Sequence, residues 1–138
     1  MYRVAALRPG QILWLGMVLL VDDDVDLRDA IREELESEGY AVVTAGDGHQ
    51  ALEELRVHAK VSLILVDLKM PTMDGRQLIA ALRREGIETP VVVLSGSAEA
   101  QRRWPRRRSI TGAIDVLEKP FRVEALLRIV AQHAHARR

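Results

Sequence analysis

The stretch Leu63–Gly75, LILVDLKMPTMDG, determines the fold more than any other part of this chain. It opens as a short apolar run, which is typical of a strand buried on both faces of a parallel sheet. The run ends at Asp67, and proline and glycine turn residues follow. Because an unpaired buried carboxylate is costly, we expect Asp67 to emerge at the carboxyl end of the strand, where open α/β sheets bind ligands.

Apolar runs of strand length alternate with helix-like patterns along the rest of the chain. Leu27, Ile31 and Leu35 recur at helical spacing, and Gly39 and Gly86 are expected to end helices. This alternation indicates βαβ units and an α/β fold: a doubly wound, five-stranded parallel sheet of order 2-1-3-4-5, flavodoxin-like, (βα)5. The predicted strands are Met17–Val21, Tyr40–Thr44, Leu63–Val66, Pro90–Leu94 and Ile114–Leu117.

The amino-acid composition excludes several classes of function. A chain of 138 residues with 48% hydrophobic residues suits one domain with a real core. The 20 basic residues balance the 20 acidic ones, so net charge does not indicate a nucleic-acid-binding protein. There is no Cys, which excludes disulfides, thiolate catalysis and Cys-based metal sites, and the four His lack the spacing of a zinc site.

The amino-terminal segment precedes the first predicted strand. The apolar stretch Ile12–Val21 is too short to span a bilayer, so no membrane association is expected. Arg3 and Arg8 leave a signal peptide as an alternative, but acidic residues follow and no cleavage site is visible, which favours a cytoplasmic protein. We expect residues 1–16 to be a dispensable extension, and residues 17–138 to form one domain with no output domain. The alternative is that Ile12–Leu15 lengthens the first strand.

The segment Gln101–Arg108 is unusual for the position where a fourth helix belongs. Pro105 would break the interior of that helix, so an irregular or kinked helix is expected. Five of its residues are Arg, which would suit an anionic partner such as nucleic acid or an acidic protein surface. The favoured interpretation is a solvated segment without a nucleic-acid partner, because Arg outnumbers Lys throughout the chain.

Polar residues follow four of the predicted strands. Asp22–Asp24 end the first strand and Asp67 ends the third, and these strands are neighbours about 5 Å apart in the expected order. Crowded carboxylates repel one another unless a cation is present, and oxygen-only ligands suit Mg²⁺. Ser95 and Lys119 end the fourth and fifth strands. An aspartate can accept a phosphoryl group, which Mg²⁺, a lysine and a hydroxyl can stabilise.

The residues at these strand ends resemble the receiver domain of bacterial two-component response regulators. The resemblance extends over residues 17–136, with its motifs in the right order on the right strands. It implies a phosphoprotein of phosphorelay signal transduction rather than an enzyme. The motifs are Asp22-Asp23, Asp67 within DLKMPTMDG, Ser95-Gly96 and Lys119-Pro120-Phe121.

The resemblance assigns the acidic residues to phosphoryl transfer. It implies that Asp67 is the phosphoacceptor. Asp67 and Asp23 would ligate Mg²⁺ directly, together with the backbone carbonyl of Lys69, and Asp22 would act through the water shell of the metal.

The resemblance also assigns roles at the fourth and fifth strands. Ser95 would bond a phosphoryl oxygen and shift on modification, and Gly96 would leave the entrance open. Lys119 would pair with the phosphoryl group, and its peptide bond to Pro120 would be cis.

Several other residues are given ordinary structural interpretations. Asp24 and Asp74 are expected to cap helices, with Gly75 present for conformational freedom. Met70 and Met73 are expected to pack under the loop rather than bind a ligand. All the histidines, His49, His58, His133 and His135, are expected to be exposed helix residues.

The chain departs from the family pattern at one position of the fifth strand. Val116 stands three residues before Lys119, where response regulators commonly carry an aromatic residue that moves with the Ser/Thr shift. The face formed by the fourth helix, fifth strand and fifth helix, through which the family usually dimerises or meets partners, is therefore unusual here.

Three hypotheses for function follow. The leading one is a stand-alone receiver that accepts a phosphoryl group from a histidine kinase or phosphotransfer protein and signals to an unknown downstream protein. The second is a non-switching receiver-like scaffold, which Val116 favours. The third is a Mg²⁺-dependent aspartyl phosphatase, suggested by the spacing of Asp22 and Asp24, although Asp26 occupies its Thr/Val position. The kinase, the pathway and the phosphoryl lifetime cannot be read from the sequence.

Overall fold

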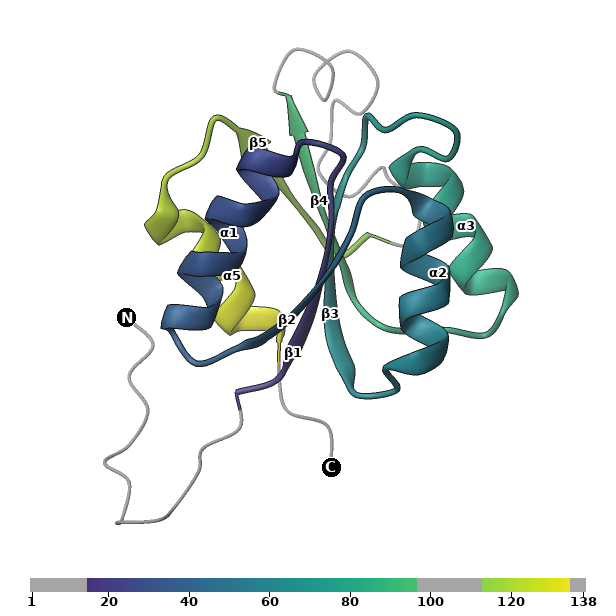
Figure 1. The fold of residues 1–138 in the computed structure, drawn as a ribbon, viewed down its shortest axis with the longest axis horizontal. Helices are drawn as coiled ribbons and strands as arrows, with labels where there is room; N and C mark the ends of the chain where they lie inside the picture. Colours follow the sequence, from purple (N-terminus) through teal and green to yellow (C-terminus); the bar gives the residue numbers. More distant parts are fainter. Residues whose placement is uncertain (1–14, 97–112, 135–138) are drawn as a thin grey trace.

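A computed structural model describes residues 15–96 and 113–134, which form a parallel sheet flanked by helices (Figure 1). The strand order β2-β1-β3-β4-β5 confirms the predicted fold. The predicted irregular fourth helix and most of the predicted extension lie outside the described residues. The strands are β1 (Met17–Val21), β2 (Ala41–Ala45), β3 (Val61–Asp67), β4 (Val91–Gly96) and β5 (Asp115–Lys119). The helices are α1 (Val25–Ser37), α2 (Gly48–Val57), α3 (Gly75–Arg84) and α5 (Val123–His133).

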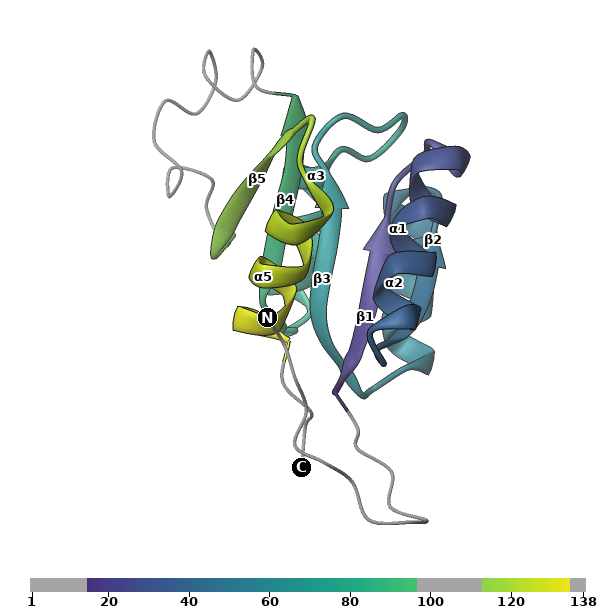
Figure 2. The ribbon, with the colours of Figure 1, turned by 90° about the vertical axis from the view of Figure 1, so that its left-hand side faces the viewer.

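Helices cover both faces of the sheet. Helices α1 and α5 lie on one face and α2 and α3 on the other, while β2 and β5 form opposite edges (Figures 1 and 2). Successive residues of a strand point to opposite faces. In β1, Leu19 and Val21 therefore join the core with α2 and α3, whereas Val18 and Leu20 join the core with α1 and α5. Among the described residues, no helix is long and apolar enough to cross a membrane.

Strand β3 is the centre of the sheet. All seven of its residues are buried, and it pairs with β1 on one side and β4 on the other. It is longer at both ends than the predicted run Leu63–Val66. At the start, the Ser62 hydroxyl donates to the carbonyl of Met17 at 3.2 Å, so a polar residue is accommodated inside the strand. At the end, Asp67 is still paired, opposite Leu94, which fixes the backbone of the residue that carries the carboxylate.

Aspartates begin the three helices that follow β1, β2 and β3. The side chains of Asp24, Asp47 and Asp74 accept from backbone N–H groups in the first turns, and Asp74 forms a full capping box with Gln77. This confirms the interpretation of Asp24 and Asp74. The glycines expected to stop α1 and α3 follow those helices with φ of +104° at Gly39 and +77° at Gly86, the region that favours glycine.

Gly75 is required for a different reason from the one expected. Its φ does not lie in the left-handed region, so conformational freedom is not its role. A Cβ at this position would lie 3.0 Å from the Asp67 carbonyl oxygen and 3.1 Å from the Cα of Leu68. Glycine therefore allows the start of α3 to approach the end of β3 closely.

One further expectation differs from the structure, and the alternative of a longer first strand can be compared with it at Leu15. Leu15 precedes β1 and is not part of it, so β1 begins at Met17 as predicted. The expectation that His133 is exposed is wrong, because its side chain is only 19% exposed and its Nε2 lies 3.8 Å from Oδ2 of Asp115. His49 is exposed as expected, and His135 lies outside the described residues.

Truncating the central strand should destabilise the protein strongly. Leu65→Ala is expected to lower the free energy of unfolding by about 2–5 kcal/mol, because Leu65 is fully buried and the space left cannot close completely. Urea unfolding measures the change. Val57→Ala is the matched control, since Val57 is 76% exposed and its truncation should change stability by about 0.5 kcal/mol or less. Similar losses in both variants would contradict the assigned core.

Candidate functional site

The carboxyl edge of the sheet brings together the residues predicted from the four strand ends. Asp22 and Asp23 follow β1, and Asp67, Ser95 and Lys119 lie at the ends of β3, β4 and β5. One carboxylate oxygen from each of the three aspartates lies within 4.8 Å of the others. Side chains far apart in sequence thus converge because the strands that carry them are successive neighbours in the sheet.

Asp22 is held rigidly at the base of this cluster. It is fully buried, and its Oδ1 accepts from the backbone N–H of Asp24 at 2.9 Å. Its own N–H donates to the carbonyl of Ala45 at 3.1 Å, and its carbonyl accepts from Nη1 of Arg28 at 3.1 Å. Asp23, in contrast, is exposed, so its carboxylate faces solvent at the mouth of the site.

Asp67 lies in an environment that disfavours its charged form. It is 8% exposed, and its Oδ1 accepts from the backbone N–H of Lys69 at 3.3 Å. Burial raises the pKa of the Asp67 carboxyl above its ordinary value of 3.8, and the Asp22 carboxylate raises this pKa further. The ammonium of Lys119 lowers the pKa but offsets only part of this rise. A cation bound between the carboxylates of Asp22 and Asp67 would therefore reduce the repulsion between them and stabilise the charged form of Asp67.

Lys119 bridges two of the carboxylates. Its Nζ lies 3.4 Å from Oδ2 of Asp22 and 3.3 Å from Oδ2 of Asp67. The peptide bond from Lys119 to Pro120 is cis, in agreement with the resemblance. The lysine is therefore placed where it can meet charge that develops on or next to Asp67.

Ser95 is a buried hydroxyl without a partner. It is 1% exposed, and among the described residues its Oγ accepts and donates no hydrogen bond. An unsatisfied buried polar group costs about 1–3 kcal/mol, so its retention calls for an explanation. Next to it, a Cβ at Gly96 would meet no atom within 4 Å, which leaves open space on this side of the edge.

The donor set fits a hard divalent cation. All the converging ligand atoms are carboxylate oxygens, and the cluster combines buried Asp22 and Asp67 with exposed Asp23. Mg²⁺ is commonly held by one or two carboxylates together with water and phosphate oxygens, which needs a site open to solvent on one side. These residues meet both requirements.

Arg28 belongs to the surroundings of the site and was missed by sequence reasoning. Besides its bond to the Asp22 carbonyl, its Nε is buried without a partner among the described residues. A Cβ at Gly46 would lie 3.1 Å from its Nη1, so the guanidinium crosses from α1 towards the loop after β2. The sequence did offer a signal for this role, because Arg28 lies in the first turn of α1, directly after the acidic motif Asp22–Asp24.

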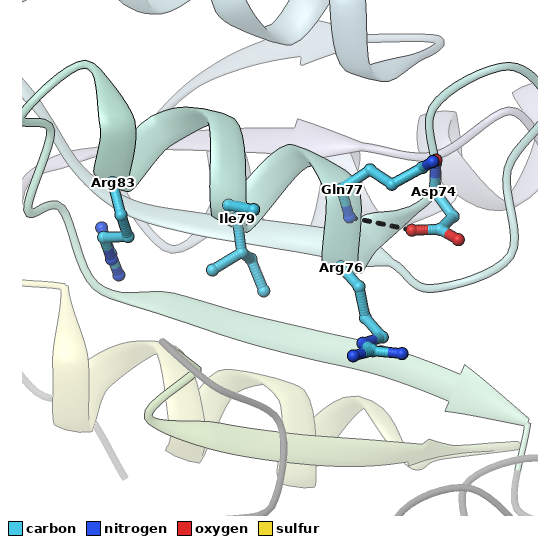
Figure 3. Close-up of a pocket in the computed structure, with 6 residues that line it drawn as sticks. Asp74, Arg76, Gln77, Ile79 and Arg83 are labelled. Atoms are coloured by element: carbon cyan, nitrogen blue, oxygen red, sulfur yellow. Dashed lines mark hydrogen bonds between the residues drawn. The ribbon is translucent and has the colours of Figure 1, made fainter.

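A hollow of about 500 Å³ runs along α3 and is separate from the acidic cluster (Figure 3). Arg76, Ile79 and Arg83 project from one side of the helix into it, and Asp74 bonds Gln77 at its amino-terminal end. None of the residues predicted to bind metal or phosphoryl groups lines this hollow. We therefore assign the chemistry to the sheet edge rather than to this hollow.

Comparison with known proteins agrees with this geometry. The model of the response regulator receiver domain matches residues 18–131. In Pseudomonas aeruginosa, the C4-dicarboxylate transport transcriptional regulatory protein DctD is 35% identical over 121 residues, and the response regulator protein FleR is 38% identical over 117. The matches cover 88% and 85% of this chain but only 26% and 24% of those proteins. The chain thus spans about a quarter of the length of these relatives.

Solved structures show the same fold. The chemotaxis response regulator CheY4 of Vibrio cholerae superposes with a TM-score of 0.75 at 29% identity, covering 86% of this chain and 98% of CheY4. The Francisella response regulator 1452 receiver domain gives a TM-score of 0.72 at 31% identity, covering 85% and 97%. With the family model matching most of its length and the acidic edge in place, this chain belongs to the response regulator receiver domain family.

Proposed function

We propose that this receiver accepts a phosphoryl group on Asp67 from a histidine kinase or phosphotransfer protein in a Mg²⁺-dependent reaction. The observation that carries the proposal is the cluster of three carboxylates, two of which pair with Lys119, with the Ser95 hydroxyl, unpartnered among the described residues, at the same sheet edge. Receiver domains are signalling domains, so the modified aspartate is the product rather than an intermediate of turnover.

Each residue has a distinct part in the proposed transfer. An oxygen of Asp67 attacks phosphorus, the bond to the donor imidazole breaks, and that imidazole keeps the bonding electrons. Asp23, Asp67 and the backbone carbonyl of Lys69 would hold Mg²⁺, with Asp22 acting through its water shell, and the ion would supply positive charge for the phosphoryl oxygens. Lys119, whose Nζ lies 3.3 Å from Oδ2 of Asp67, pairs with the transferred group. The Ser95 hydroxyl donates a hydrogen bond to a phosphoryl oxygen.

The output is proposed to pass through protein contacts. Phosphorylation would shift an equilibrium between two arrangements of the domain, with the Ser95 bond present in only one of them. Val116 favours the alternative of a non-switching scaffold, since it is 5% exposed and already packed in the core. A partner that binds equally well before and after phosphorylation would identify the scaffold.

The other expectations stay predictions. These are the dispensable residues 1–16, the cytoplasmic location, dimerisation or partner binding through the fourth helix, fifth strand and fifth helix, and action without an output domain. The last is open because the matched segment covers about a quarter of DctD and FleR. The aspartyl phosphatase hypothesis loses its basis, because the side chain of Asp24 caps α1 by accepting from the N–H of Leu27 at 3.1 Å.

Replacing the phosphoacceptor should abolish labelling. Asp67→Asn is expected to lose Mg²⁺-dependent phosphorylation by acetyl phosphate, because an amide oxygen is a poor nucleophile for phosphorus. A Phos-tag gel measures the modified fraction. Asp47→Asn is the control, since asparagine still caps α2 and Asp47 lies outside the cluster. Unchanged labelling of Asp67→Asn would show that another residue is the acceptor.

The same substitution should stabilise the metal-free protein in a pH-dependent way. The raised pKa means that the folded protein binds the Asp67 proton more tightly than the unfolded chain does. Ionisation of Asp67 therefore lowers stability as the pH rises from its ordinary pKa of 3.8 through the raised value. In EDTA, Asp67→Asn should be more stable than wild type at neutral pH, and the difference should shrink towards acid. Urea unfolding across pH measures it, and a difference independent of pH would contradict this origin.

Removing the unpartnered hydroxyl should cost no stability. Ser95→Ala is expected to unfold at the same or higher urea concentration than wild type, because it deletes an unsatisfied polar group. Ser62→Ala is the matched control: its buried hydroxyl bonds the Met17 carbonyl, so its loss should cost about 1 kcal/mol. Phosphorylated Ser95→Ala should also show smaller NMR shift changes on β4 than wild type. A marked loss of stability in Ser95→Ala would show that the hydroxyl has a structural partner.

A further inference from the structure

Met73, in the loop between β3 and α3, packs against Gly48, the first residue of α2. A Cβ built on Gly48 would lie 2.5 Å from Sδ, 2.7 Å from Cγ and 2.9 Å from Cβ of Met73. Separations below 3.0 Å do not occur for real Cβ atoms, so any larger residue at this position must displace Met73. The φ of Gly48 does not lie in the left-handed region, so the absence of a side chain serves this contact rather than the backbone.

We propose that Gly48 and Met73 are positioning residues, whose contact sets the place of the β3–α3 loop and, through it, of the Asp67 carboxylate and Lys69 carbonyl. This inference rests on the proposed function, because it concerns how well the site binds a divalent cation. Neither residue touches the cation or the phosphoryl group. Both act on the chain segment that carries the ligands.

The β3–α3 loop is short and internally closed, so it moves as a unit. The N–H of Gly75 donates to the carbonyl of Leu68 at 3.0 Å, which closes the loop at its base. Within it, the N–H of Met73 donates to the carbonyl of Pro71 at 2.7 Å, and Thr72 has a φ of +63°. A displacement of Met73 is therefore expected to shift the whole loop rather than Met73 alone.

The other side of the contact is rigid. The side chain of Asp47 accepts from the N–H of Gln50 at 2.8 Å, and the side chain of Gln50 accepts in return from the N–H of Gly46 at 2.7 Å. Ala51, one turn on, is fully buried in the core. Gly48 is thus fixed in the first turn of α2. When a methyl group is added at this position, Met73 is therefore the residue that moves.

The displacement cannot be taken up by the end of the methionine side chain. Its Cβ is one of the three close atoms, and this atom is attached directly to the backbone of the loop. Rotation about the outer bonds would move Sδ but leave the Cβ in place. The backbone must shift, and the same loop carries the N–H of Lys69 that donates to Oδ1 of Asp67 at 3.3 Å.

A double-mutant cycle on the full chain tests the proposal with Gly48→Ala, Met73→Gly and the two combined. Mg²⁺ affinity is measured by titrating ¹⁵N-labelled protein with MgCl₂ and following the Lys69 amide resonance. Gly48→Ala should bind Mg²⁺ on the order of tenfold more weakly than wild type, the size seen when a group that orients metal ligands is disturbed. The combined variant should bind within about twofold of Met73→Gly alone, because no side-chain atom of residue 73, its Cβ included, is left to be displaced.

Two measurements without metal separate positioning from general damage to the fold. The Lys69 amide shift in EDTA should move in Gly48→Ala and return to its Met73→Gly value in the combined variant. Alanine is a better helix former than glycine, so in the Met73→Gly background Gly48→Ala should raise Tm or leave it unchanged. Gly46→Ala, two residues before Gly48 in the β2–α2 loop, is the matched control, since its methyl would meet only the ends of the Arg28 and Gln50 side chains, and its Mg²⁺ affinity should equal that of wild type.

The outcomes that overturn the proposal differ from those that overturn the proposed function. Unaltered Mg²⁺ affinity and an unaltered Lys69 shift in Gly48→Ala would refute the positioning role alone. So would a combined variant as weak as Gly48→Ala, or an equal loss in Gly46→Ala. Failure of the wild-type protein to bind Mg²⁺ at all would instead refute the proposed phosphoryl-acceptor function.

Discussion

The repulsion among carboxylates at one edge of the sheet is the constraint on which this structure depends. Asp22 and Asp67 are buried within a few ångströms of each other, and their two carboxylates share the ammonium of Lys119. Burial and like charge raise the pKa of Asp67, so the metal-free fold keeps an electrostatic cost at its centre. The rest of the molecule tolerates that cost because β3, which carries Asp67, is paired on both sides and buried along its whole length.

The fold and the members of the site could largely be predicted from the sequence, because both follow from simple regularities. Apolar runs alternating with helical spacing specify a parallel sheet, and in such a sheet the strand ends meet at one edge. Asp22, Asp67, Ser95 and Lys119 each end or directly follow a strand, so strand order alone brought them together. Strand limits were less predictable: β3 begins earlier than its apolar run, because the Ser62 hydroxyl finds a carbonyl within the sheet.

Contacts between elements that are distant in the sequence could not be predicted from it. Gly75 looked like a turn residue, but its role comes from the backbone of Asp67 and Leu68 lying against it. His133 looked like an exposed helix residue, yet the end of α5 brings it near Asp115 at the start of β5. Such contacts depend on how far each helix is displaced over the sheet, which periodicity does not encode. The same limitation applies to Gly48, whose partner Met73 comes from a different βα unit.

Strand β5 is an edge strand, paired only with β4, yet it supplies the cation that the acidic cluster requires. In the order of synthesis, the three aspartates leave the ribosome well before Lys119 does. A chain with β1 and β3 paired but β5 absent would hold these carboxylates together without that ammonium, and their repulsion would oppose closure of the site. Pairing of the last strand completes the sheet and offsets part of this repulsion at the same time. The residue that pairs with the acidic cluster is thus contributed by the last strand of the sheet and the one at its edge.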